Sequence, residues 1–274
     1  MNIPLREADV DPFLRHMRQR AWPKHLSPWV SHAVVDIENL PTMGPPPMEI
    51  SKYAPFESVL RIMRGEKADI SRPIKRPNEK LRLLLNGRKV VLAGGCIRDL
   101  YLFENPEKIK DVDVFILDCD PSDSDRILSA VAEVTYALDG SYKASADYFL
   151  DRLRAVPNNS VLNVGNVTLD ISHPIQVITT TAVSVEDLLG KFDWNICRFA
   201  YDGENFWFPG WKDVALKRLT LGDNIVDPYW TMRRGVLFSE KFKGFPVRLH
   251  KQDVMLLLHM WMMNTDGKEV VGGI

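Results

Sequence analysis

The fold is decided by residues 90–117, VVLAGGCIRDLYLFENPEKIKDVDVFIL. An apolar run is followed by a glycine pair, an Arg-Asp pair and a second apolar run that contains two aspartates. The apolar run at 90–93 predicts a strand, residues 95–104 predict a helix, and 111–117 predict a second strand. This segment therefore predicts a strand, helix, strand unit with polar residues at its turns.

The two aspartates break the strand pattern. Residues i and i+2 of a strand point to one face, so Asp111 and Asp113 project together while Val112 and Val114 pack on the other side. Asp is disfavoured in strands, and two neighbouring carboxylates repel each other. A divalent cation is the simplest relief, and Mg²⁺ is the usual choice where hard carboxylate oxygens also serve a nucleoside triphosphate.

The glycine pair suits a phosphate ligand. Gly94 and Gly95 would let the backbone approach closely and present N–H groups at the start of a helix. For the pair alone, an ordinary strand-to-helix turn that needs glycine is the favoured explanation. The combination with Arg98, Asp99 and the later D-x-D is more specific than the glycine pair.

These residues resemble the head domain of the polymerase-β-type nucleotidyltransferases, in particular bacterial-type CCA-adding enzymes and poly(A) polymerases. Their first motif is G-G-x-V-R-D followed by D-x-D, and this chain has GGCIRD at 94–99 and DVD at 111–113. The resemblance implies an α+β fold, a mixed sheet flanked by helices and followed by a helical neck. It implies that Asp111 and Asp113 hold a pair of Mg²⁺ ions, and that Gly94, Gly95, Arg98 and Asp99 bind the nucleotide.

A second match lies at residues 185–200, VEDLLGKFDWNICRFA, which are similar to the family's acidic helix start and R-R-D-F-T-I-N-A. Asp193 falls on the family's aspartate. Lys191 and Phe192 stand where two arginines contact phosphates and ribose, and Cys197 replaces an asparagine. The resemblance implies a nucleotide-binding role for Lys191 and Asp193, with one cation in place of two.

A third match lies at residues 226–245, VDPYWTMRRGVLFSEKFKGF, similar to E-D-P-L-R-x-L-R-x-x-R-F-A, which closes the head and starts the neck. Asp227 and Arg233 correspond, and the resemblance implies that both bind nucleotide. Val226 replaces the glutamate and Trp230 replaces an arginine that reads the base edge. A tryptophan can stack on a base but cannot form that hydrogen-bond pattern. A solvated basic face explains Arg233 and its neighbour equally well.

The wider superfamily often has a third carboxylate on a neighbouring strand. Gln176 stands in that place in PIQVI, and glutamine is a poor metal ligand and no general base. Asp170, in VTLDI, is the alternative, although it fits an edge-strand surface residue as well. The sequence leaves both choices open.

The pattern elsewhere predicts a helix at 123–135 opened by Ser122 or Ser124, strands at 160–164, 167–171 and 174–180, and a helix from near Val185. Residues 228–263 read as mostly helical with a break at 244–246. We expect an N-terminal extension at 1–85, a head domain at 86–225, and a helical neck with a C-terminal helix at 226–274.

Composition restricts the class of protein. With 274 residues, 45% of them hydrophobic, the chain can bury a sizeable core, and its net charge of -1 excludes a globally basic nucleic-acid-binding protein. Cys96, Cys119 and Cys197 are odd in number and lack C-x-x-C spacing, which favours buried thiols in a reducing compartment. No signal sequence and no apolar stretch of roughly 18 residues is seen, so we expect a cytoplasmic protein without membrane spans.

Two further segments suggest partners. Residues 71–89 carry seven Lys or Arg against one Glu, and could bind RNA in place of the long C-terminal body that the family has beyond its neck. Residues 253–264, DVMLLLHMWMMN, are apolar on nearly every face, which predicts burial in the core, against a protein partner or in an oligomer.

Two functions follow. The leading hypothesis is an enzyme that transfers a nucleotidyl group from an NTP, ATP or CTP, to a hydroxyl, with an RNA 3′ end as the favoured acceptor. The alternative is a degenerate member of the fold that serves as a nucleotide-binding, RNA-binding or structural interaction component. The replaced arginines favour the alternative, whereas the intact D-x-D favours the enzyme, because two repelling aspartates cost stability without a metal.

Overall fold

The computed structural model describes part of the chain. The described residues are 43–44, 59–61, 63–64, 77–103, 109–145, 151, 159–169, 174–215, 218–222, 224–225, 228–242, 245 and 247–248. Asp170, Val226, Asp227 and the segment 253–264 lie outside them, so the predictions for those residues stay predictions.

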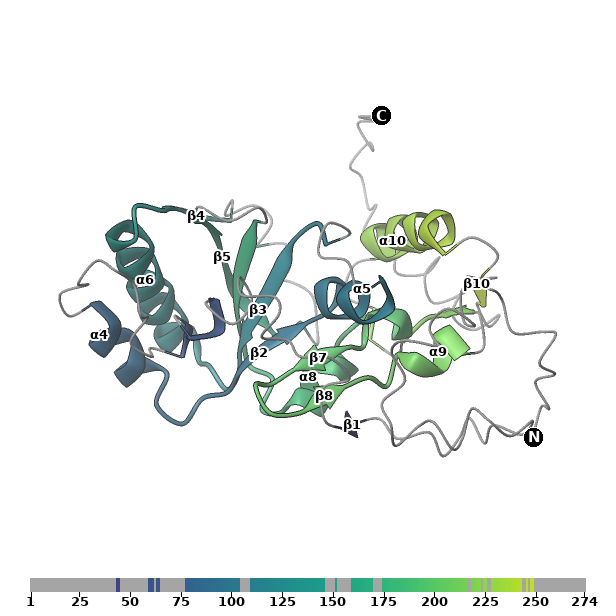
Figure 1. Ribbon diagram of the computed structural model, residues 1–274, viewed down its shortest axis with the longest axis horizontal. Helices are drawn as coiled ribbons and strands as arrows, with labels where there is room; N and C mark the ends of the chain where they lie inside the picture. Colours follow the sequence, from purple (N-terminus) through teal and green to yellow (C-terminus); the bar gives the residue numbers. More distant parts are fainter. Residues whose placement is uncertain are drawn as a thin grey trace.

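A mixed sheet of eight strands runs through the described residues, in the order β1-β8-β7-β2-β3-β6-β5-β4 (Figure 1). β3 and β6 pair in parallel, and the other neighbours pair antiparallel. The strands are β1 Met43–Gly44, β2 Val90–Ala93, β3 Val112–Ile116, β4 Ser141–Ala144, β5 Val161–Thr168, β6 Ile175–Thr180, β7 Ala200–Tyr201 and β8 Phe206–Trp207. A separate parallel pair joins β9, Leu219–Thr220, to β10, Val247–Arg248.

Helices flank this sheet, so the predicted α+β class, with a mixed sheet flanked by helices, is confirmed. In Figure 1, α4 and α6 lie together at one end of the molecule and α10 lies at the other. The helices are α4 Pro77–Leu84, α5 Gly95–Phe103, α6 Pro121–Ala137, α8 Val185–Gly190, α9 Trp211–Ala215 and α10 Pro228–Lys241, with a 3₁₀ turn, η5, at Asn195–Cys197.

The alternation of β3 divides the core between the two faces of the sheet. Val112, Val114 and Ile116 belong to the larger apolar cluster, which includes side chains of α5 and α6. Phe115 belongs to the second cluster, which includes the buried leucines of α8. Because residues of opposite parity point to opposite faces, α5 and α6 cover one face of the sheet and α8 covers part of the other.

The central unit agrees with the sequence prediction. β2 spans the predicted residues 90–93, α5 ends one residue before the predicted end, and β3 lies within the predicted strand. α8 begins at Val185 as predicted, with Ser184 as its N-cap. α10 confirms the predicted helix after residue 228 as far as Lys241.

Two local predictions were wrong. Asp120, rather than Ser122 or Ser124, caps α6, because its carboxylate accepts the Asp123 backbone N–H at 2.9 Å and Pro121 fits the first helical turn. The two strands predicted at 160–164 and 167–171 form the continuous strand β5 as far as Thr168.

Gly165 explains the error in β5, since a glycine in the middle of an apolar run resembles a break. A Cβ on Gly165 would lie 2.5 Å from the Tyr142 hydroxyl oxygen. The glycine is therefore needed for the close approach of the Tyr142 ring from β4, and it does not end the strand.

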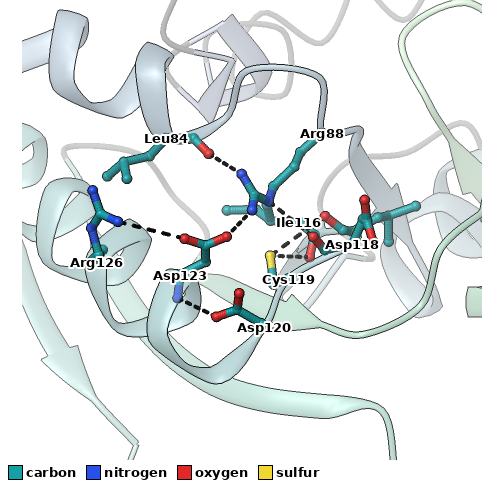
Figure 2. A network of polar contacts seen from close by, with 9 residues as sticks. Leu84, Arg88, Ile116, Asp118, Cys119, Asp120, Asp123 and Arg126 are labelled. Atoms are coloured by element: carbon teal, nitrogen blue, oxygen red, sulfur yellow. Dashed lines mark hydrogen bonds and ion pairs between the residues drawn. The ribbon is translucent and has the colours of Figure 1, made fainter.

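A network around Arg88 fixes α4 to the loop between β3 and α6 (Figure 2). The guanidinium donates to the backbone oxygens of Leu84, at 2.6 Å, and Asp118, at 3.1 Å, and it pairs with the Asp123 carboxylate. Asp118 has a φ of 56°, in the left-handed region. Arg88 belongs to the predicted basic segment, and its charge is satisfied within the protein.

The rest of α4 also packs inward. Leu81 and Leu85 are buried in the same cluster as β2, and Lys80 pairs with Glu133 of α6 at 2.7 Å on the surface. Arg82 is exposed. The apolar side chains in the helical part of the basic segment thus belong to the core of the sheet. The domain boundary predicted after residue 85 stays a prediction.

The three cysteines are buried and free, as predicted from their spacing. Burial raises the pKa of each thiol, to about 11 for Cys197. Among the helices of the described residues, none combines the length and the apolar character needed to cross a membrane.

Candidate functional site

The predicted glycine turn lies against the predicted aspartate. Gly94 joins β2 to α5 with a φ of +84°, a conformation that favours glycine. A Cβ on Gly94 would lie 3.3 Å from Phe192 Cε1 and 3.5 Å from Asp113 Oδ2. Gly94 therefore brings the backbone close to the Asp113 carboxylate, and these two predicted site residues come together.

The two aspartates of the D-x-D lie at the start of β3. Asp111 is exposed just before the strand, and Asp113 is partly exposed between the buried Val112 and Val114. Burial, followed by the charge of Asp111, raises the pKa of Asp113 to about 7, while the charge of Arg234 acts to lower it. The charge of Asp111 thus acts against ionisation of Asp113, in the direction that the sequence predicted.

A row of polar residues continues from Asp113 across three more strands. Asp113 of β3 is paired with Gln176 of β6, Gln176 with Asn166 of β5, and Asn166 with Lys143 of β4. Directly paired residues point to the same face of a sheet. Gln176 Nε2 donates to Asn166 Oδ1 at 3.2 Å. This face of the sheet therefore carries a polar surface beside the aspartates. α8 packs on the same face, farther along the strands.

The Arg98 side chain does not belong to this row of polar residues. Its side chain is 3% exposed, and its Nε donates to Asp99 Oδ1 at 2.8 Å. The guanidinium carbon lies 5.3 Å and 5.2 Å from the ring centroids of Phe238 and Phe242, which belong to α10 and the residue that follows it. The predicted nucleotide-binding arginine is thus buried between α5 and α10.

Asp99 completes the same contact. Its second carboxylate oxygen accepts from Lys241 Nζ, at the end of α10, at 2.5 Å. Asp99 is 4% exposed, so this carboxylate is enclosed between two cations. The Arg-Asp pair of the first motif therefore binds α10, and the structure does not bring it beside Asp113.

Asp193 of the second motif also contacts α10. Its carboxylate accepts from Thr231 Oγ1 at 2.7 Å and pairs with Arg234. The neighbouring Trp194 donates from Nε1 to the Thr231 carbonyl at 2.9 Å. A Cβ on Gly235 would lie 2.6 Å from Trp194 Cζ2, so the glycine allows the helix to approach the indole. Asp193 and Trp194 together dock α10 on the sheet domain.

Arg234 links the two groups of residues. It pairs with Asp193 and lowers the pKa of Asp113 through its charge, while nearly half of its side chain, 47%, is exposed. Sequence reasoning did not separate it from Arg233, whose guanidinium carbon lies 4.8 Å from the centroid of the Trp230 ring. The i, i+3 spacing of Thr231 and Arg234, which places both on one face of a helix, was the signal that could have distinguished them.

Lys191 lies at the end of α8 and pairs with Asp187 of the same helix at 3.5 Å. Its backbone carbonyl accepts from Asn224 Nδ2 at 3.1 Å. Phe192, which follows it, packs on Phe115 in an edge-to-face contact and closes the space beside the glycine turn. Of the two residues that replace the family's arginines, Phe192 and not Lys191 lies against Gly94.

Comparison with solved structures finds similar chains of low identity. A CCA-adding enzyme with ATP is 16% identical, with a TM-score of 0.45. The match covers 82% of this chain and 46% of the enzyme's chain. The Thermotoga maritima CCA-adding enzyme with tRNA is 14% identical, with a TM-score of 0.42 and coverages of 82% and 47%. A tRNA-processing enzyme with CTP is 15% identical, with a TM-score of 0.41 and coverages of 66% and 45%. The chain spans about half the length of these proteins, and we transfer no residue role from them.

No curated protein matches the chain at a significant level. A protein family does match, over residues 64–215, which is more than half of the 274 residues. This family is described as Gabija anti-defense 2 family protein, a description that does not name the CCA-adding and poly(A) polymerase group that the motifs resemble. The matched range contains the glycine turn, both aspartates of the D-x-D and Asp193, and the chain therefore belongs to the Gabija anti-defense 2 family.

Proposed function

We propose that this protein is a Mg²⁺-dependent nucleotidyltransferase that acts on an NTP, ATP or CTP, and a hydroxyl acceptor. The observation that carries the proposal is the position of Asp113, beside Asp111 and against the Gly94 turn. Two close carboxylates next to a glycine turn at a helix start are what a metal-bound triphosphate requires. An RNA 3′ end is the favoured acceptor, and the cytoplasm, which supplies NTPs and RNA, is the proposed location.

The donor set fits Mg²⁺. Asp111 and Asp113 offer hard oxygen ligands, and a nearby positive charge would favour the ionised form of Asp113, whose pKa burial and the charge of Asp111 raise to about 7. Arg234 supplies only part of it, since the same guanidinium pairs with Asp193. When bound at Asp111 and Asp113, Mg²⁺ would neutralise phosphate charge and favour ionisation of the acceptor hydroxyl.

The chain's own residues would bind and orient the substrates. Gly94 and Gly95 leave room for phosphate oxygens at the start of α5, where backbone N–H groups and the helix dipole favour an anion. We assign Arg98 and Asp99 a positioning role, because they hold α10, which carries Arg234, beside the aspartates. Nucleotide contacts by Lys191, Arg233 and Asp227 remain predictions from the resemblance.

The reaction balances without a further reactant. The acceptor oxygen forms a bond to the α-phosphorus, the bond from that phosphorus to the bridging oxygen breaks, and pyrophosphate leaves. The hydroxyl proton is released. Catalysis then consists mainly of positioning and charge stabilisation, which suits a site whose carboxylates and arginine are fixed by a sheet and a docked helix.

One observation favours a second function, that of an interaction component without transfer activity. Arg98, Asp99 and Asp193 all contact α10, so three residues of the enzyme-like motifs have a structural explanation. The family is named for action against Gabija, which binding alone could also achieve. The intact pair of aspartates opposes this second function, because it costs stability without a cation.

The experiment that tests the proposal is label transfer. The purified protein is incubated with each labelled NTP, Mg²⁺ and total RNA, alongside Asp111→Asn, Asp113→Asn and, as a matched control, the exposed Asp118→Asn. We expect transfer by the wild type and the control and none by the other two variants. Transfer by both site variants would exclude the metal assignment.

Protection assays separate the second function. Each variant is expressed in cells that carry a Gabija system, and survival of the cells under phage infection is measured. If nucleotidyl transfer is the active chemistry, wild type and the Asp118→Asn control counteract the defence and cell survival falls, whereas cells with Asp111→Asn or Asp113→Asn survive. Low survival with folded site variants would support the interaction component.

A further inference from the structure

We propose that the Gln176 side-chain carbonyl is a third, uncharged ligand of the metal site, and that Asn166 orients it. This inference rests on the metal site of the proposed function. It assigns a ligand role to a residue whose type argued against one in the sequence, and a positioning role to Asn166 on the neighbouring strand.

The register of the sheet places Gln176 at the site. It is the parallel partner of Asp113, so the two side chains leave the same face of adjacent strands, with Cα atoms roughly 4.8 Å apart. Gln176 is partly exposed, as Asp113 is. A cation held by Asp113 on this face would have the glutamine amide as its neighbour on the β6 side.

A hydrogen bond fixes the direction of the amide. Gln176 Nε2 donates to Asn166 Oδ1 at 3.2 Å, and Asn166 lies on β5, on the side of β6 opposite to β3. The oxygen and nitrogen of a planar amide diverge from one carbon. With Nε2 directed to Asn166, Oε1 is turned away from Asn166, and we infer that it serves as the ligand on the Asp113 side of β6.

The charge of the site explains why an amide suits this position. Among the described residues, no three His, Cys, Asp or Glu side chains come together as a metal site. A third carboxylate would add another negative charge beside Asp111 and Asp113. A carbonyl oxygen is a hard ligand acceptable to Mg²⁺ and Mn²⁺ and adds no charge. With one divalent ion bound, two carboxylates and one amide would give a site with no net charge.

The test is Mn²⁺ binding to the full chain, measured from the electron paramagnetic resonance signal of the free ion, with no activity readout. Gln176→Met keeps the side-chain length and removes the hard oxygen, and we expect about tenfold weaker binding or more. Gln176→Glu is expected to bind Mn²⁺ more tightly than wild type at pH 8. It provides the second measurement should the Met variant not fold.

Asn166 is tested with a matched pair. Asn166→Leu removes the acceptor of the amide hydrogen bond and is expected to weaken Mn²⁺ binding about tenfold. Asn166→Asp keeps an acceptor oxygen and is expected to retain at least wild-type affinity. Thr168→Ala, on the same face of β5 and exposed, is the control and should change nothing. Urea unfolding confirms that each variant folds.

The outcomes distinguish this inference from the proposed function. If wild type binds Mn²⁺ and folded Gln176→Met binds it with the same affinity, the ligand role of Gln176 is overturned. The proposed function is unaffected by that result. Weak binding by Gln176→Met together with unchanged binding by Asn166→Leu overturns the role of Asn166. A wild-type protein without any Mn²⁺ site overturns the metal site of the proposed function and this inference with it.

Discussion

The charge of Asp113 makes a prediction about metal-free stability. Burial and the charge of Asp111 raise the pKa of Asp113 from 3.8 to about 7 in the folded protein. The unfolded chain loses this proton near the ordinary pKa, whereas the folded protein keeps it until near neutrality. Between these values the folded state binds more protons, so the contribution of Asp113 to stability is full below about pH 4 and is lost as the pH rises through 7.

The size of the effect follows from the shift. A pKa displacement from 3.8 to about 7 corresponds to a free energy on the order of 4 kcal/mol once Asp113 is fully ionised. The asparagine side chain introduced by Asp113→Asn would be uncharged at every pH and of nearly the same shape. We expect Asp113→Asn to match wild type in free energy of unfolding near pH 3, and to exceed it by up to this amount at pH 8.

Urea unfolding in EDTA at a series of pH values measures this difference. Subtracting wild type from variant cancels the other titrating groups. Asp118→Asn, at an exposed position, serves as the control variant. The stability advantage over wild type should rise less with pH for Asp111→Asn than for Asp113→Asn. Asp111→Asn removes the charge that is the second cause of the raised pKa of Asp113, but Asp113 stays buried.

Addition of saturating Mg²⁺ completes the test. A cation at the site favours the ionised carboxylate, so it should stabilise wild type at pH 8 and shrink the advantage of Asp113→Asn. The same reasoning predicts that Mg²⁺ binding strengthens as the pH rises through 7. Parallel curves of wild type and Asp113→Asn from pH 4.5 to 8 would refute the argument.

Three further predictions concern the surroundings of the site. Gly94→Ala should cost about 1 to 3 kcal/mol, because its φ of +84° is strained for alanine, and it should also weaken Mn²⁺ binding; an unchanged melting temperature would contradict this. Arg88→Met should destabilise the fold by about 1.5 to 3 kcal/mol and leave Mn²⁺ binding intact, since its network lies at the far end of β3. If the basic segment binds RNA, Arg82→Gln should lower the slope of the logarithm of the RNA-binding constant against log salt by about 0.7 to 0.9. Lys80→Gln should have less effect, because Lys80 pairs with Glu133. Unchanged RNA binding by Arg82→Gln in a filter assay would exclude this role.

The centre of the fold and site could be predicted because its signals are local. The apolar runs that became β2 and β3, the glycine turn and the parity of Asp111 and Asp113 all lie within one short segment. Backbone periodicity alone then determines which side chains share a face. The meeting of Gly94 and Asp113 follows from the antiparallel pairing of β2 with β3.

The contacts of α10 could not be predicted in this way. Arg98 and Lys241 each engage partners far along the chain, and local pattern does not report which helix packs on which. A motif resemblance then assigned Arg98 to a ligand. The two-residue strands β7 and β8 were also missed, because two residues are too few to show a period of two.

The docking of α10 by Arg98, Asp99 and Asp193 changes what a shared motif means for relatives of this chain. Selection for a stable helix contact could maintain these three residues after catalysis had been lost. Their presence in a homologous sequence would therefore indicate the same fold. Asp111 and Asp113, which repel each other without a cation, would indicate metal-dependent activity. A relative that keeps Arg98, Asp99 and Asp193 but replaces both aspartates of the D-x-D should fold in the same way and be a pseudoenzyme.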